Sequence, residues 1–105
     1  MTSPAVSGSA SPGGGADPRP EPVRVELDRI ERRWAELPLA RAQESMPRLR
    51  VALDALAGVL GREPVEDLGP ASAVHQLKVL AWEAARAGRA DGIPPWLADL
   101  RRDLP

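Results

Sequence analysis

Residues 23 to 105 carry apolar side chains at intervals of three and four, and no segment shows the alternation of a β-strand. The first such run has the spacing 4-3-4-3, which places its members on one narrow face of a helix. Since the same period recurs to the end of the chain, the buried surface must come from packed helices, and the sequence predicts an all-α fold. The first run is Val23, Leu27, Ile30, Trp34 and Leu37.

Prolines and glycines set the limits of the predicted helices. Proline suits the first turn of a helix, and the residue before a proline is pushed away from helical angles. Pro22 and Pro38 therefore bound a first helix over residues 23–36. The second helix is expected to end at Gly61 in the left-handed conformation. A third helix over 71–87 opens after Gly69 and Pro70 and stops at Gly88, and a short last helix covers 95–102.

Pro47 interrupts the second apolar run, which extends from Leu39 to Leu60. A proline in a helix interior removes one backbone hydrogen bond. We therefore expect Ser45 to be the N-cap of a helix with Pro47 in its first turn, preceded by a short helical turn over residues 39–44. A single kinked helix is the alternative.

The predicted architecture is a small three-helix bundle, up-down-up, closed by the short C-terminal helix. Residues 62–69 form a connecting loop whose Val65 and Leu68 are expected to fold back over the open end of the bundle. The candidate core is Leu27, Ile30, Trp34, Leu49, Leu53, Leu56, Leu77 and Leu100.

Residues 1–22 differ in composition from the rest, because 16 of the 22 are Pro, Gly, Ser or Ala. Such a segment buries too little apolar area to offset the entropy of ordering it, which predicts a disordered tail before a domain at residues 23–105. The start of the chain lacks a secretory signal pattern, and no run approaches the length of a membrane span. We therefore expect a cytoplasmic protein without membrane contact.

Few residues are available for chemistry. The chain has no cysteine and one histidine, His75, and its serines outside the tail, Ser45 and Ser72, follow no glycine-rich elbow. Glu63, Glu66 and Asp67 form an acidic loop whose charges suit the start of the third helix better than a metal ion. No phosphate-binding glycine loop is present. The sequence predicts no catalytic, cofactor or metal site, and hence no enzyme.

Arginines fall in three clusters. Residues 23–105 contain 13 basic and 13 acidic side chains, so the region is neutral overall, which argues against nucleic acid as a partner. Asp28, Arg32 and Glu36 are spaced to form ion pairs along the first helix. A DNA-binding protein that uses the arginine clusters is nevertheless the second hypothesis for function. The clusters are Arg29, Arg32 and Arg33, then Arg48 and Arg50, and finally Arg101 and Arg102.

The third predicted helix is apolar on two sides. One face carries Val74 and Leu77, and a second stripe carries His75, Val79 and Trp82. A second apolar face is covered either inside the domain or by a partner. Because Trp96 follows a short linker, we expect the last helix to lie over this stripe; a protein interface centred on Trp82 is the alternative.

The leading hypothesis is a non-enzymatic interaction module, an adaptor or regulator that binds another protein or a second copy of itself as a homodimer. It rests on the second stripe and on the lack of a catalytic set. After DNA binding, the third hypothesis is a small-ligand-binding protein or enzyme with a pocket between helices.

Two stretches, LPLARAQESMPRL and VEDLGPASAVHQLKVLAWEAARAG, are similar to small uncharacterised helical proteins of actinobacteria. The resemblance covers residues 34–104 and implies a helical fold but no activity. The ratio of 13 arginines to one lysine also indicates a bacterial source with a GC-rich genome.

Overall fold

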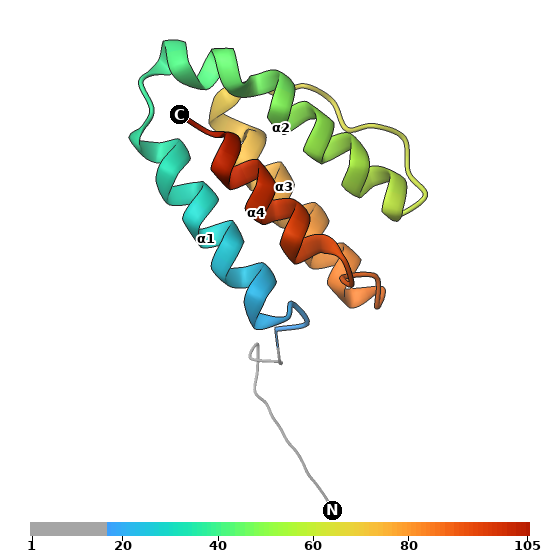
Figure 1. The fold of residues 1–105 in the computed structure, drawn as a ribbon. Helices are drawn as coiled ribbons and strands as arrows, with labels where there is room; N and C mark the ends of the chain where they lie inside the picture. The colour runs from blue at the N-terminus through green and yellow to red at the C-terminus, as the bar shows by residue number, and fades with distance from the viewer. Residues whose placement is uncertain (1–16) are drawn as a thin grey trace, which may run out of the picture.

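The computed structural model describes residues 17–105, in which every regular element is an α-helix (Figure 1). The predicted all-α helical bundle is therefore confirmed. Residues 1–16 of the predicted tail lie outside the described part. Within residues 17–105, no helix is both long and apolar enough to cross a membrane. The helices are α1 (Glu21–Glu36), α2 (Leu39–Val59), α3 (Pro70–Arg86) and α4 (Ile93–Asp103).

The helix ends follow the prolines and glycines. α1 and α4 each begin two residues before the predicted start, with prolines inside their first turns, where the missing N–H would have no partner. Gly61 and Gly88 adopt φ of 70° and 72°, so the left-handed end predicted at Gly61 is confirmed. At both glycines the backbone N–H groups of the glycine and the next residue return to carbonyls of the last helical turn, as in a Schellman motif.

α2 runs without a break through Pro47, so the prediction of a separate helix capped by Ser45 is wrong. Ser45 is fully buried, and its Oγ atom has no hydrogen-bond partner in the described part of the chain. Pro47 itself is exposed. Ala42 before the proline and Leu49 after it are both buried, so packing on either side offsets the lost backbone hydrogen bond.

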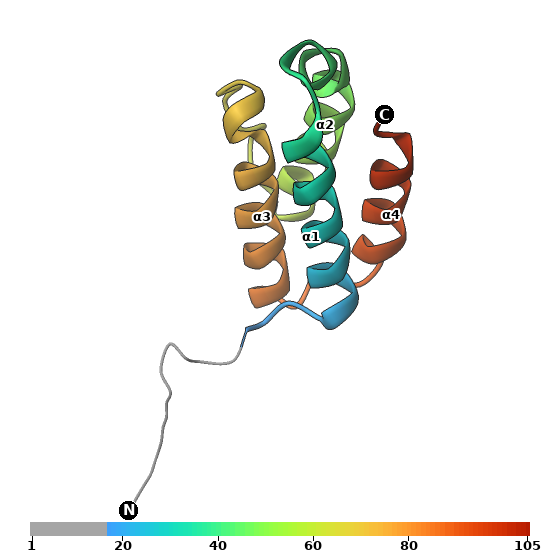
Figure 2. The same cartoon turned by 90° about the vertical axis from the view of Figure 1, so that its left-hand side faces the viewer.

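The direction of α3 differs from the predicted up-down-up order. The loop over 62–69 runs back along α2, so α2 and α3 are parallel, and the observed order is up, down, down, up (Figures 1 and 2). Two contacts join the C-terminal ends of these helices: an ion pair between Arg62 and Glu83, and a hydrogen bond of 2.8 Å from Arg89 Nη1 to the carbonyl oxygen of Val59. Antiparallel helices would have separated these residues by the length of α3.

Arg50 fixes the returning loop to α2. Its Nη2 atom donates a hydrogen bond of 2.6 Å to the carbonyl oxygen of Val65, 15 residues later. Val65 is half-buried and packs against the core, but beside the middle of α2 and not over the open end of the bundle, where it was expected. The expectation for Leu68 is wrong, because its side chain is 55% exposed. Val65 thus joins the loop to the bundle by one polar contact and one apolar contact.

We expect Arg50→Met to lower the free energy of unfolding by about 1.5 kcal/mol, because the Val65 carbonyl loses a charged donor while the aliphatic packing remains. The measurement is urea unfolding followed by circular dichroism. Arg48→Met is the matched control, since Arg48 is exposed on the same helix, and its effect should stay within about 0.5 kcal/mol. Equal losses in the two variants would contradict an anchoring role for Arg50.

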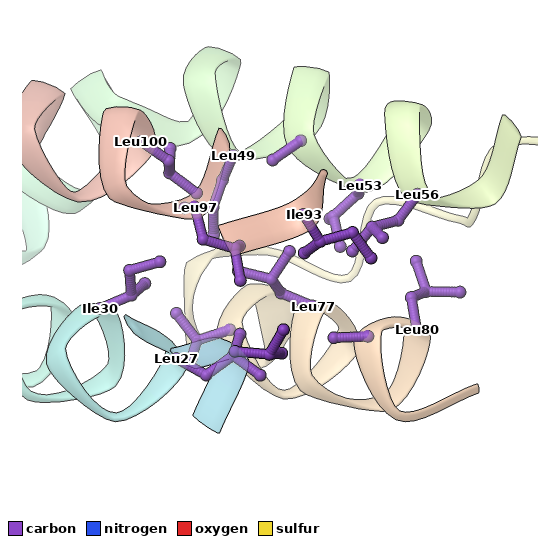
Figure 3. Packing of buried hydrophobic residues seen from close by; sticks show 14 of the residues in the cluster. Leu27, Ile30, Leu49, Leu53, Leu56, Leu77, Leu80, Ile93, Leu97 and Leu100 are labelled. Carbon is purple, nitrogen blue, oxygen red and sulfur yellow. The ribbon is translucent and has the colours of Figure 1, made fainter. Parts of the chain in front are cut away.

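The core lies where all four helices meet (Figure 3). α2 packs mainly on α3 and α1 mainly on α4, while α1 also contacts α3 and α2 also contacts α4. The structure buries seven of the eight candidate core residues, and the eighth, Trp34, is partly buried. α4 is therefore a full wall of the bundle and contributes Ile93, Leu97 and Leu100 to the core.

The ion pairs between helices replace those expected within α1. Asp28, Arg32 and Glu36 form no ion pair with one another among the described residues. Instead, Glu26 Oε1 accepts a hydrogen bond of 2.6 Å from Arg101 Nε in α4, and Glu31 Oε1 lies 3.0 Å from Lys78 Nζ in α3. α1 is thus tied by charge to both of the helices that it contacts.

Candidate functional site

The outer face of α3 carries the three residues proposed from the sequence as an interface. His75, Val79 and Trp82 are all exposed, and the exposed fractions of Val79 and Trp82 are 43% and 39%. The buried residues of α3, among them Leu77, lie on the opposite side of the helix. We call His75, Val79 and Trp82 the α3 outer stripe.

Charged contacts hold α3 on both sides of this stripe. On the α1 side, Lys78 is paired with Glu31, and on the α2 side, Glu83 is paired with Arg62. Buried Leu77 and Ala81 fix the inner face. The outer stripe is therefore presented by a helix that is anchored in three directions.

Arg86 is the residue of this face that the sequence reasoning missed. Its guanidinium carbon lies 5.0 Å from the ring centroid of Trp82, which is cation–π geometry. The signal was available, because Arg86 follows Trp82 by four residues and so shares its helix face. The contact favours one orientation of the indole and places a positive charge beside the apolar stripe.

The last helix does not cover the stripe, so that expectation is wrong. α4 packs on α1 and α2, and Trp96 lines two grooves between α4 and α2 instead of contacting Trp82. Gly88 and Gly92, both at positive φ, turn the chain between α3 and α4. The turn sends α4 along the side of the bundle away from the outer face of α3 (Figure 2).

Two of the three arginine clusters come together. Arg29, Arg32 and Arg33 of α1 line one open cleft with Arg101 and Arg102 of α4. The remaining cluster is divided: Arg50 holds the loop, and Arg48 is exposed on α2. The sequence could not indicate this meeting, because 68 positions separate Arg33 from Arg101.

Comparison with known protein families, with curated proteins and with solved structures gives no significant match. Any function must therefore be argued from the surfaces of this chain alone.

Two residues of the acidic loop, Asp67 and Glu66, form hydrogen bonds that involve backbone groups. Asp67 Oδ1 accepts a hydrogen bond of 2.9 Å from the N–H of Gly69, which forms a tight turn immediately before α3. The carbonyl oxygen of Glu66 accepts one of 2.9 Å from Gln76 Nε2. In residues 17–105 no group of three or more His, Asp or Glu side chains is placed to hold a metal ion.

A groove of about 230 Å³ lies between α2 and α4. It is mainly apolar, and Asp91 is the one titratable residue among those that line it. Its lining residues are Ala55, Leu56, Val59, Asp91, Gly92, Ile93 and Trp96.

Proposed function

We propose that this protein is an interaction module that binds a protein partner through the outer stripe of α3. The observation that carries the proposal is the placement of Val79 and Trp82: both are exposed on a helix whose opposite face is fully packed. Tryptophan and arginine are the residues most enriched at the energetic centres of protein interfaces, and Trp82 and Arg86 stand together here.

The surroundings of the stripe have the composition of an interface rim. The stripe is only two helical turns long, about 10 Å, and its three side chains alone do not supply the roughly 800 Å² of surface that each partner buries in a stable complex. A partner must therefore also cover the charged residues on either side, including Lys78 and Glu83. An apolar centre with a charged rim is the usual arrangement of such contacts.

Trp82→Glu tests the proposal directly. Since Trp82 points outward, the variant should keep the helix content of the wild type, whereas a carboxylate in a desolvated interface should weaken association by several kcal/mol. Circular dichroism reports the fold. Sedimentation velocity reports self-association, and capture with the tagged full chain from its source cell reports a foreign partner.

Val51→Glu is the matched control. Val51 is 67% exposed on α2, so the change introduces the same charge on another face. The partner, or the second copy, should be retained by Val51→Glu and lost by Trp82→Glu. Association that survives in Trp82→Glu, or that is lost equally in both variants, would contradict a binding role for the stripe.

A further inference from the structure

A cleft between α1 and α4 carries a strong positive charge. It has a volume of about 410 Å³ and is lined by five arginines and one glutamate. The arginines come from the first and the last helix of the domain, which are far apart in the sequence. They meet because α1 and α4 lie side by side in parallel (Figure 2). We call Arg29, Arg32, Arg33, Glu36, Arg101 and Arg102 the arginine cleft.

The parallel arrangement explains how so many like charges can share one site. Arg33 is in the last turn of α1, and Arg101 and Arg102 are in the last turn of α4. Parallel helices bring these two C-terminal ends together, and the partial negative charge of each end favours a nearby cation. The fold thus partly offsets the repulsion among the guanidinium groups.

Glu26 positions one edge of the cleft. Its side chain is 14% exposed, and its two oxygens contact different arginines: Oε1 lies 2.6 Å from Arg101 Nε, and Oε2 lies 3.5 Å from Arg29 Nη1. A single carboxylate therefore orients two guanidinium groups from two helices. Such preorganisation reduces the entropy lost when a ligand binds.

Arg32 and Arg33 supply the uncompensated charge. Both are exposed, and neither forms an ion pair with a carboxylate in residues 17–105. Arg102 is paired with Asp99, so it is partly neutralised. Guanidinium groups present planar pairs of N–H donors that match the oxygens of phosphate, and several of them together favour a ligand with more than one phosphate.

We propose that the arginine cleft binds a compact anion that carries two or three adjacent phosphate groups. The ligand is compact because the cluster of five arginines is bounded by carboxylates. Glu36 lines the cleft itself, and Glu26 and Asp99 stand beside its arginines. An extended polyanion such as duplex DNA would bring its further phosphates toward these carboxylates and gain little from the rest of residues 23–105, where eight basic side chains are outnumbered by twelve acidic ones.

The test measures binding of inorganic tripolyphosphate to the full chain by isothermal titration calorimetry at about 50 mM NaCl, where screening is modest. One anion should bind per chain. Arg32→Gln/Arg33→Gln should weaken binding at least about tenfold, because two charged donors are lost. The circular dichroism spectrum of this variant should match that of the wild type, since both side chains are exposed.

Arg24→Gln/Arg41→Gln is the matched control, because it removes the same charge from exposed positions outside the cleft. This variant should weaken binding by no more than about twofold, through the long-range field alone. Equal weakening in the two double variants would overturn the proposal, as would the lack of any binding up to about 5 mM tripolyphosphate.

Two further ligands identify the source of the phosphates. ATP that binds more tightly than tripolyphosphate indicates a nucleotide, and equal affinity indicates recognition of the phosphate groups alone; both results support the proposal. If a short mixed-sequence DNA duplex binds more tightly than tripolyphosphate, the proposal of a compact ligand is overturned. Trp82→Glu should bind tripolyphosphate like the wild type, so this proposal can fail independently of the interface on α3.

Discussion

Leu77→Ala is expected to lower the free energy of unfolding by about 3–5 kcal/mol, the largest effect of any substitution considered for this protein. Leu77 is 0% exposed and lies where residues from α1 and α4 approach α3, beside Leu27 and Leu97 (Figure 3). Truncation removes buried apolar atoms and leaves a cavity that the neighbouring helices fill only in part. A domain of this size is stable by only about 5 kcal/mol, so a loss at the upper end of this range would leave about half of the population unfolded at 25 °C.

Urea unfolding followed by circular dichroism measures this loss. Leu39→Ala is the matched control, because Leu39 is also in a helix but is 66% exposed, and its effect should remain within about 0.5 kcal/mol. A loss for Leu77→Ala below about 1 kcal/mol would contradict a close-packed core at this position.

Trp34→Ala should lower the free energy of unfolding by about 3 kcal/mol, and Trp34→Phe by about 1 kcal/mol. The two substitutions separate the two roles of the side chain. Its ring packs against the core, and its Nε1–H donates a hydrogen bond of 2.9 Å to the carbonyl oxygen of Pro70. Phenylalanine keeps most of the packing and loses the donor, whereas alanine loses both.

The hydrogen bond of Trp34 joins the end of α1 to the start of α3, 36 residues away. Trp82→Phe is the control, since the exposed Trp82 indole has no hydrogen-bond partner in the described part of the chain, and its effect should stay within about 0.5 kcal/mol. Trp34→Phe that is as stable as the wild type would show that the hydrogen bond does not contribute; equal losses for Trp34→Phe and Trp34→Ala would assign the whole effect to it.

The number of helices and most of their limits were predictable, because the signals are local. The 4-3-4-3 run of α1 identifies its buried face, and Gly61 ends α2 through contacts within a few residues. Pro47 shows where a local signal fails. A proline in a helix interior is unfavourable in isolation, but Ala42 and Leu49 on either side of it are buried against other helices, and this packing outweighs the local cost.

The two apolar sides of α3 were visible in the sequence, and Leu77 was correctly placed in the core, but whether the second side is also covered could not be determined. His75, Val79 and Trp82 could have faced α4, and the expectation that Trp96 would cover them was wrong. Whether the outer stripe of α3 is covered depends on which helices α4 packs against. No pattern within ten or twenty residues carries that information, because it arises from competition among all the faces in the bundle.

The sequence by itself determined most of the helix limits and the inner faces that the helices bury, because helix period, capping and proline geometry act over a few residues. Only the tertiary structure decided the direction of α3. The loop over 62–69 can span about 26 Å when extended, close to the length of α3, about 25 Å, so it permits either direction. In the observed structure α3 is parallel to α2, and the contacts of Arg50, Arg62 and Arg89 form in this direction. That direction makes α4 parallel to α1, and the arginine cleft exists because their basic C-terminal turns then lie side by side.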